Sequence, residues 1–484
     1  MSPFDAARYA RLLEGLEAVE RQASAVFSRE RMDSEAFAKA ALEVAARLAK
    51  LPRVDALSQI AAVSDGNHLS IANEFGDAES GVRYLRGQDI SSAMMLDDRN
   101  PVYIPDSEFD KLARSHIFRD DVLITIVGAN TGQTALVDAA PDKLTANCKL
   151  GILRAKRGVT PPAYLHAFLA GRYGQSQVLS AKRGGGQTGL ILPDLKALVV
   201  ARFSKTFEQR VANVSVLAHR TNRERRKHIE MAEALLLFSL GLDSWQAPEP
   251  LSYVRHSAEA FASGRLDAQH FQPRFQALTD FINATGQGGR LANWLGENQR
   301  GRQPDYVDEG SPVVNSKHVL RGEVRVDNDN RNASFGDDDL LIHHGDVLLN
   351  GTGVGTIGRC APYLHAEAAI PDNHVTVLRP KKGLDAVYLS VFLNSMAGQW
   401  QVEQRLRGSS GQIELYPNDI AQFSVWIAPA AVQAKIRKSV ETSHEQRQRA
   451  AQLLAAATRA VEIAIEDSEA AALAYLDKVA PRAH

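Results

Sequence analysis

The sequence predicts an α+β protein with two similar strand-rich domains and two long helices. Three observations support this prediction: a repeat of whole-domain size, β-branched runs between turn residues, and two long stretches without glycine or proline. The repeat is clearest where residues 121–124 (Asp-Val-Leu-Ile) return as residues 346–349 (Asp-Val-Leu-Leu), at an offset of 346 − 121 = 225. Solenoids and propellers repeat every 20–50 residues or so, about a fifth of this period at most. The offset therefore indicates two copies of a complete domain.

Further matches keep the same order along the chain. Residues 31–37 return as residues 265–271. Later matches are single residues or pairs: Gly174-Gln175 with Gly398-Gln399, Gly184 with Gly408, and Pro193 with Pro417. The small drift in offset indicates short insertions and deletions in loops.

The first copy begins with a region rich in helix formers. Residues 1–54 are predicted as an N-terminal helical region, because alanine, leucine, glutamate and arginine dominate and no glycine or proline lies between Leu16 and Lys50. Residues 55–203 carry short β-branched runs between turn residues and form the first strand-rich domain. Its clearest strand spans residues 121–127, and a short helix begins at Pro161, since proline is tolerated in a first helical turn.

A long helix is predicted over residues 204–244. More than thirty residues pass there without glycine or proline, with apolar residues on helical spacing. At ~1.5 Å per residue such a helix is about 50 Å long, which is typical of a coiled-coil arm rather than a globular helix. A linker with two prolines follows over residues 245–256.

The second copy repeats this organisation. Residues 257–428 form a second strand-rich domain with a leading helix, residues 429–478 a second long helix, and residues 479–484 a tail. Each long helix is apolar along one stripe only, so each needs a partner. The simplest partner is the other helix. The two then form an antiparallel coiled-coil spacer, and the two copies are related as a pseudo-two-fold internal repeat.

Composition limits the class of protein. The net charge is −1, whereas free-standing DNA-binding proteins are usually basic; a DNA-binding function therefore requires local cationic surface or a partner that supplies it. Cys148 and Cys360 do not occupy equivalent positions, so we expect no disulfide framework, no zinc site and a reducing cytoplasm. The charged N-terminus indicates no signal peptide, and no apolar run is long enough to span a membrane.

A glycine-rich stretch at residues 351–358 (Gly-Thr-Gly-Val-Gly-Thr-Ile-Gly) suggests a nucleotide site. Dinucleotide sites need a helix directly after the glycines, so that its N-terminus meets the phosphates. Residues 359–362 (Arg-Cys-Ala-Pro) do not begin a helix. We favour a tight turn between strands. A nucleotide-dependent enzyme using this loop stays open as a hypothesis of another class.

A second glycine-rich loop recurs in both copies and carries basic residues and glutamine. Residues 182–189 (Lys-Arg-Gly-Gly-Gly-Gln-Thr-Gly) correspond to residues 405–412 (Arg-Leu-Arg-Gly-Ser-Ser-Gly-Gln). Glycine allows close backbone approach to a ligand. Glutamine can pair with adenine and arginine or lysine with guanine in the major groove. The loops are candidate DNA contacts; the alternative is a flexible surface loop beside solvated charges.

The sequence carries no catalytic or metal-binding motif that we recognise. It lacks the HExxH and GxSxG patterns and the motif of adenine methyltransferases, and its histidines lack metal-ligand spacing. We therefore expect a binding protein with no catalytic residue, no metal and no cofactor.

Two motifs, one of which occurs in both copies, resemble those of the specificity subunits of type I restriction–modification systems. Residues 84–90 (Tyr-Leu-Arg-Gly-Gln-Asp-Ile) resemble the family's Leu-Arg-Gly-x-Asp-Ile signature. Residues 120–128 and 345–353 resemble its Gly-Asp-Ile-Leu signature, and residues 355–359 its later glycines. The first motif is replaced by Val-Asn-Ser-Lys-His-Val at residues 314–319, as expected for domains that read different sequences. The helical region before the first domain is longer than the family pattern.

The resemblance implies that each strand-rich domain is a target recognition domain that reads half of a bipartite, asymmetric site in double-stranded DNA. It implies a non-enzymatic subunit that docks DNA adenine methyltransferase subunits. It leaves open whether a restriction (motor–nuclease) subunit also takes part. A second hypothesis keeps the fold but places it in a different phage-defence complex that modifies or cuts DNA. The residues predicted to contact DNA are Arg86, Gln88, Lys182, Arg183, Gln187, Lys317, His318, Arg405, Arg407 and Gln412.

Overall fold

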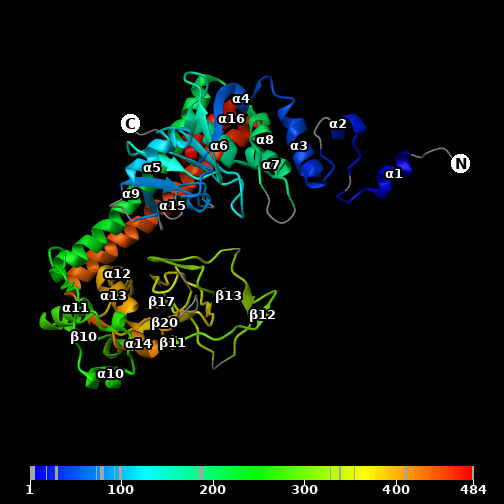
Figure 1. Ribbon diagram of the computed structural model, residues 1–484. Coiled ribbons are helices and arrows are strands. Elements are labelled where there is room, and N and C mark those ends of the chain that lie inside the picture. Colours follow the sequence, from blue (N-terminus) through cyan, green and yellow to red (C-terminus); the bar gives the residue numbers. More distant parts are fainter. Residues whose placement is uncertain are drawn as a thin grey trace. The chain divides into compact units, whose positions relative to one another are not determined.

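The computed structural model describes residues 6–17, 19–27, 31–71, 74–76, 81–91, 93–96, 101–184, 189–327, 329–336, 339–353, 355–408 and 413–481. The chain divides into two compact units (Figure 1). Unit 1 comprises Met1–Glu224 and Gln446–His484, and unit 2 comprises Arg225–Glu445.

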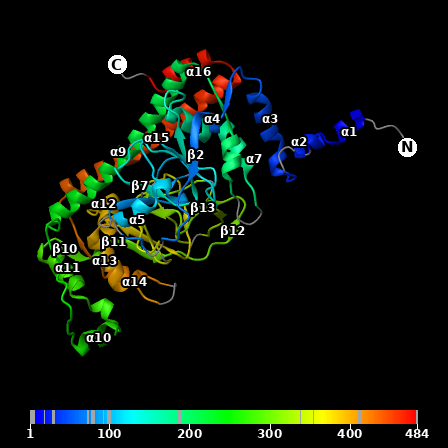
Figure 2. The same ribbon diagram turned by 45° about the horizontal axis from the view of Figure 1, so that its top comes forward.

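Unit 1 is built on a four-stranded antiparallel sheet in the order β2-β8-β5-β6. Its strands are β2 (Ala61–Asp65), β5 (Val122–Thr125), β6 (Thr134–Leu136) and β8 (Leu150–Ala155). Every residue of β5 is buried, as its unbroken apolar run predicts. Figure 2 shows this sheet beside the helices that cover it.

The other elements of unit 1 surround this sheet. A second sheet has the order β4-β3-β7, with β3 and β7 parallel, and β1 pairs with β9. These strands are β1 (Val54–Ala56), β3 (Val82–Leu85), β4 (Val102–Ile104), β7 (Leu144–Ala146) and β9 (Val199–Ala201). The helices are α4 (Leu57–Ile60), η4 (Gly87–Asp89), α5 (Asp106–Lys111), η5 (Ala113–Ser115), α6 (Pro162–Ala170), α7 (Arg172–Ala181) and α8 (Leu192–Ala197).

Unit 2 repeats the strand order of unit 1. Its four-stranded sheet has the order β11-β20-β17-β18, and β13 pairs in parallel with β19 as β3 does with β7. Its strands are β10 (Gly288–Arg290), β11 (Leu295–Arg300), β12 (Tyr306–Val307), β13 (Ser311–Val314), β14 (Val319–Leu320), β15 (Glu323–Val324), β16 (Asn332–Ala333), β17 (Val347–Asn350), β18 (Cys360–Pro362), β19 (Ile370–Pro371), β20 (Val375–Pro380) and β21 (Ser424–Trp426). The α+β class and the internal repeat are therefore confirmed.

The helices of unit 2 include counterparts of α6, α7 and α8. They are α10 (Ser257–Ser263), η6 (Ala268–Phe271), α11 (Pro273–Ala284), η7 (Leu291–Trp294), α12 (Ala386–Asn394), α13 (Met396–Arg405) and α14 (Pro417–Ala421). The repeated glycine in α7 and α13 has a steric cause. A Cβ on Gly174 would lie 2.5 Å from the Cα of Leu169, and a Cβ on Gly398 would clash in the same way with Leu393. Only glycine allows these helices to pack so closely on α6 and α12.

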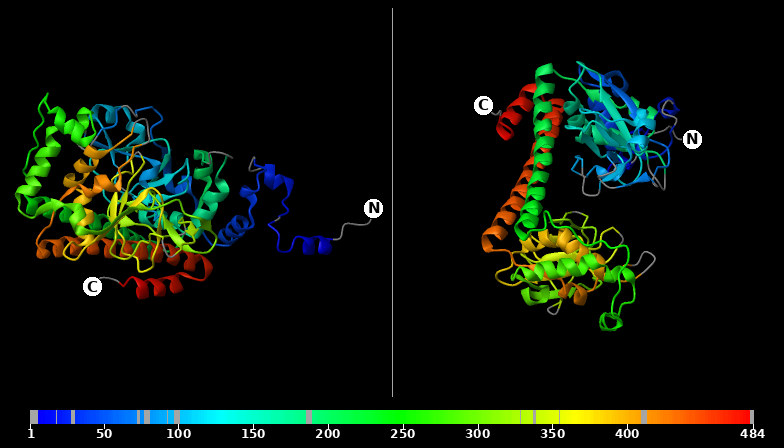
Figure 3. Two further views of the ribbon diagram at one scale, coloured as in Figure 1. Left: turned by 90° about the horizontal axis from the view of Figure 1, so that it is seen from below. Right: turned by 60° about the vertical axis from the view of Figure 1, so that its left-hand side comes forward.

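The two long helices predicted from the sequence are present as α9 (Lys205–Leu240) and α15 (Ala430–Glu466). In unit 1, Val211 and Ala218 of α9 share a core with Leu454 and Val461 of α15. In unit 2, residues 232–240 of α9 share a core with residues 436–440 of α15. Within each unit the two helices therefore pack side by side and antiparallel (Figure 3).

The second long helix ends earlier than predicted. It stops at Glu466, and α16 (Glu469–Val479) begins after a two-residue break. Ser468 causes the break, because its hydroxyl accepts a hydrogen bond from the Ala471 amide at 3.2 Å and so caps a new helix. A single helix over residues 429–478 is therefore wrong at its C-terminal end.

The N-terminal region is helical but broken. It contains α1 (Ala6–Leu12), α2 (Ala23–Phe27), η1 (Glu35–Phe37) and α3 (Lys39–Leu48). Leu16, Phe27 and Met32 are exposed, so this stretch has no apolar stripe to bury along a longer helix. Both η1 and α3 pack against α7, and Figure 2 shows α3 beside α7.

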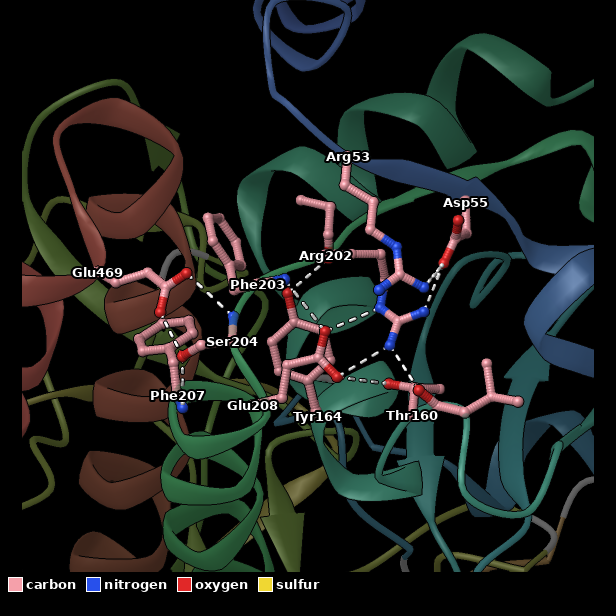
Figure 4. Close-up of polar contacts among 12 residues, drawn as sticks. Arg53, Asp55, Thr160, Tyr164, Arg202, Phe203, Ser204, Phe207, Glu208 and Glu469 are labelled. Atoms are coloured by element: carbon pink, nitrogen blue, oxygen red, sulfur yellow. Dashed lines mark hydrogen bonds and ion pairs between the residues drawn. The ribbon is translucent and has the colours of Figure 1, made fainter.

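A buried ionic network fastens the start of α9 to the first strand-rich domain (Figure 4). The Arg202 guanidinium donates to Glu208 and to Asp55, and Tyr164 Oη donates to the Ala201 carbonyl at 2.6 Å. In unit 2 the tyrosine contact recurs between Tyr388 and Trp426, also at 2.6 Å.

Candidate nucleic-acid interface

Three loops of unit 1 converge where strand β5 ends. The Thr125 hydroxyl donates to the Gly87 carbonyl at 3.4 Å, which places the segment after β3 beside the end of β5. The Leu190 amide donates to the Ile126 carbonyl at 2.7 Å, which brings the segment after α7 to the same place. Segments far apart in sequence thus form one surface at one end of the sheet.

The same three loops converge in unit 2, at the end of β17. The Asn350 amide group donates to the Ser316 carbonyl at 2.9 Å, and the Leu415 amide donates to the Gly351 carbonyl at 2.9 Å. Asn350 and Thr125 differ by the repeat offset of 225. In unit 2 the glycine-rich stretch after β17 and the segment that closes the second glycine-rich loop are therefore neighbours.

The glycine-rich stretch after β17 is a turn between two strands, as predicted. Strands β17 and β18 pair antiparallel on either side of it. Because β18 rather than a helix follows the turn, these glycines do not open a helix. In unit 1 the corresponding turn joins β5 and β6.

The second glycine-rich loop is closed at its base in both units. Arg183 and Gly189 exchange two backbone hydrogen bonds of 2.8 and 2.9 Å, and so do Arg407 and Glu414. We call Arg183 with Gly189 and Arg407 with Glu414 the loop bases. Gln187 and Gln412, both predicted to contact DNA, lie outside the described residues.

The arginines of the loop bases have carboxylate partners. Arg183 Nη2 donates to Asp194 at 2.8 Å, and Arg407 Nη2 donates to Asp419 at 2.8 Å. Their side chains are still 36% and 50% exposed, so part of each guanidinium faces solvent. A guanidinium has five donors and can hold a carboxylate and a phosphate together.

Two other predicted basic residues are less accessible. Lys182 is half-buried, and burial lowers its pKa. Arg405 lies over the Phe423 ring, 5.3 Å from its centroid, and donates to the Gln401 carbonyl at 3.2 Å. Burial lowers the pKa of Arg405 to about 10. Arg405 therefore contributes to packing more than to the surface.

The segment after β3 and β13 differs between the units. Arg86 donates to Asp89 at 3.1 Å, and Gln88 is exposed beside it. Lys317 is exposed and pairs with Asp329 at 2.9 Å. His318 is only 1% exposed, and its Nδ1 accepts from the Asn315 amide at 3.2 Å. The expectation of a DNA contact by His318 is therefore corrected, since the ring lies inside the turn that it stabilises.

Sequence reasoning missed a pair of exposed residues at equivalent positions just before β8 and β20. Lys149 occupies this position in unit 1 and His374 in unit 2, at the repeat offset of 225. The backbone amide of each donates to the side chain two residues earlier, that of Asn147 or Asp372. His374 Nδ1 also lies 2.7 Å from the Thr352 hydroxyl, at the turn after β17. The offset itself would have found both residues.

No group of three or more histidine, cysteine, aspartate or glutamate side chains able to hold a metal ion occurs within the described ranges. Among the same residues, no helix combines the length and the apolar character needed to cross a membrane.

Comparison with known proteins gives structural neighbours only. No family model and no curated protein matches the sequence. The type I restriction-modification system S subunit from M. genitalium is 13% identical, with a TM-score of 0.38 over 86% of this chain and 95% of that chain. The HsdS subunit from Thermoanaerobacter tengcongensis is 17% identical, with a TM-score of 0.26 over 89% of this chain and 98% of that chain. Both TM-scores are below 0.5, so neither similarity supports a statement about function.

Proposed function

We propose that this chain is the DNA-reading specificity subunit of a type I restriction–modification system. Each strand-rich domain would read one half of a bipartite, asymmetric site in double-stranded DNA. The supporting observation is the repeated convergence of three loops at one end of a sheet, where the two units share a backbone but differ in their polar side chains. The segments after β3 and β13, with Arg86 and Gln88 in one unit and Lys317 in the other, suit two different half-sites.

The long helices suit the role of spacer. At ~1.5 Å per residue, the 36 residues of α9 and the 37 of α15 give lengths of about 54–56 Å. Half-sites one helical turn apart are separated by ~34 Å, which helices of this length can bridge. The helices would also dock adenine methyltransferase subunits, whose target base must leave the duplex before it can react. Partners that bind phosphates would explain how a chain of net charge −1 binds DNA.

Domain exchange tests this function. The full chain would be selected against duplex DNA of random sequence, and the selected DNA sequenced. We expect a bipartite site whose binding falls steeply with salt. Replacing residues 55–203 with the corresponding domain of another such protein should change one half-site and preserve the other. A change in both halves would refute modular reading.

Recruitment of a methyltransferase is tested separately. The chain would be co-expressed with a methyltransferase encoded beside its gene, and methylated adenines in the host genome would be mapped by single-molecule sequencing. Methylation confined to the selected bipartite site is the expected result. Methylation at other sites, or none, would favour the alternative of a different defence complex.

A further inference from the structure

The earliest match of the repeat, Arg-x-Asp at residues 31–33 and 265–267, forms the same structure in both units. In unit 1, Arg31 donates to Asp33 through Nε at 2.8 Å and Nη2 at 2.5 Å. The same guanidinium donates to the carbonyls of Ser180 at 2.7 Å and Lys182 at 2.6 Å. These carbonyls stand at the end of α7, directly before the loop base at Arg183.

Unit 2 repeats this contact. Arg265 donates to Asp267 through Nε at 2.6 Å and Nη2 at 2.9 Å, and its Nη1 donates to the Leu406 carbonyl at 3.0 Å. Leu406 directly precedes the loop base at Arg407. The hydrogen bond from Arg265 lowers the pKa of Asp267 to about 2, which keeps the pair ionised. We call Arg31 with Asp33, and Arg265 with Asp267, the arginine clamps.

The clamps satisfy groups that the helix cannot. The last carbonyls of a helix lack intrahelical partners and carry partial negative charge, and a cation there is favourable. The side chains of Arg31 and Arg265 are only 8% and 16% exposed, so they hold the carbonyls away from solvent. A charged hydrogen bond in such a place is stronger than a neutral one.

Each loop base is thus held from two sides. One contact is the ion pair made by the arginine of the base itself, between Arg183 and Asp194 or between Arg407 and Asp419. The other contact is made by the arginine clamp, which donates to the carbonyl directly before the base. In each unit the clamp and the arginine of the loop base also line one surface hollow, of about 790 Å³ in unit 1 and 430 Å³ in unit 2.

We propose that Arg31 and Arg265 are positioning residues for sequence readout, one for each half-site. This inference rests on the proposed DNA-reading function. Each clamp fixes where the glycine-rich loop leaves the domain, and acts on DNA only through that loop. The clamps contact carbonyls at the ends of α7 and α13 rather than the buried sheets, so their loss should alter base preference before it alters stability.

Selection from random duplex DNA with the full-length variants Arg31→Ala and Arg265→Ala tests the proposal. Because each change removes charged hydrogen bonds to the loop, base preference should fall by at least ~10-fold. Arg31→Ala should relax the half-site of the first domain alone, and Arg265→Ala that of the second alone. Arg157→Ala removes an exposed arginine of unit 1 and serves as control. Equal effects on both halves, or no effect on either, would overturn the proposal.

Hydrogen exchange separates failure of this inference from failure of the proposed function. Arg31→Ala should speed exchange of the Arg183 and Gly189 amides, which close the loop base, and leave those of Arg407 and Glu414 unchanged. Unchanged exchange in unit 1 would overturn the clamp whether or not the chain binds DNA. Failure of the parent chain to select any sequence, with the exchange pattern as expected, would overturn only the proposed function.

Discussion

The Arg202 guanidinium donates to the Glu208 carboxylate at 2.8 and 3.1 Å, and both side chains are almost completely buried, with 3% and 2% exposed. Glu208 lies in the first turn of α9, where a negative charge is favourable. A second carboxylate, from Asp55, accepts from the other side of the guanidinium. The pair joins the long helix to the first strand-rich domain.

Unit 2 joins its long helix to its strand-rich domain without charged residues at these positions. This difference allows a direct test of the Arg202–Glu208 pair. Ile427 and Gln433 occupy the places of Arg202 and Glu208, and the Gln433 amide donates to the Ala428 carbonyl at 2.8 Å. We expect Arg202→Ile to lower the free energy of unfolding of unit 1 by about 3–5 kcal/mol, because it leaves a buried carboxylate unpaired. Adding Glu208→Gln should restore all but about 1.5 kcal/mol.

Urea titration can follow the two units separately. All four tryptophans (Trp245, Trp294, Trp400 and Trp426) lie in unit 2, so tryptophan fluorescence reports that unit alone, while circular dichroism reports both. The changes at residue 202 should move the circular dichroism transition and leave the fluorescence transition in place. A double variant less stable than the single one would contradict the assigned role of the pair.

A second ion pair, with a buried carboxylate and a partly exposed arginine, occurs in both units. Arg154 donates to Asp121 at 2.8 Å and Arg379 to Asp346 at 2.7 Å, with both carboxylates at most 2% exposed. Arg379→Ala should destabilise unit 2 by roughly 2–3 kcal/mol, at the low end for a buried pair because the arginine is partly exposed. Tryptophan fluorescence in urea measures this. Arg302→Ala, at an exposed site, should stay within about 0.5 kcal/mol of the parent.

Most of the fold could be predicted from the sequence, because the two copies keep the same residue at sterically demanding positions. Gly174 with Gly398 and Asp121 with Asp346 keep their identity, since a Cβ or an unpaired charge there would disrupt packing. The break between α15 and α16 was missed because it depends on a single capping contact. Ser468 lies within a stretch of good helix formers, and only its hydroxyl contact to Ala471 shows that a new helix begins there.

The candidate site was predicted in part. The loops were found because both copies share glycines and basic residues, but sequence does not show which side chains are committed to internal contacts. His318 looks like any exposed polar residue until its ring is seen to accept from Asn315. The role of Arg31 was hidden for the same reason, since its partners are carbonyls 149 and 151 residues away.

Lys149 is expected to contact a DNA phosphate. It is exposed and lies beside the Arg86 segment, since a Cβ added to Gly87 would lie 3.5 Å from the Cβ of Lys149. Lys149→Ala should weaken binding to all sequences alike and reduce the slope of log K against log salt concentration by about 1. Fluorescence anisotropy at several salt concentrations measures this slope. A loss of base preference at an unchanged slope would instead make Lys149 a base contact.

A buried histidine pair makes the stability of unit 1 depend on pH. His166 and His219 are 0% and 3% exposed, and their facing nitrogens lie 3.3 Å apart, between α6 and α9. Burial lowers the pKa of His166 from 6.5 to about 4, and burial also lowers the pKa of His219 well below 6.5. The folded state keeps both rings neutral.

Protonation therefore favours the unfolded chain. Between pH 6.5 and 4 the unfolded state binds more protons than the folded state. The contribution of the neutral rings to the free energy of unfolding of unit 1 should therefore be complete above about pH 7 and should decrease as the pH falls. Each ring contributes up to about 1.4 kcal/mol per pH unit in that window. His219→Gln removes one titrating ring and should reduce the slope by up to that amount. Urea titrations by circular dichroism at pH 7, 6 and 5 would measure it; equal slopes in parent and variant would show that the pair does not control this response.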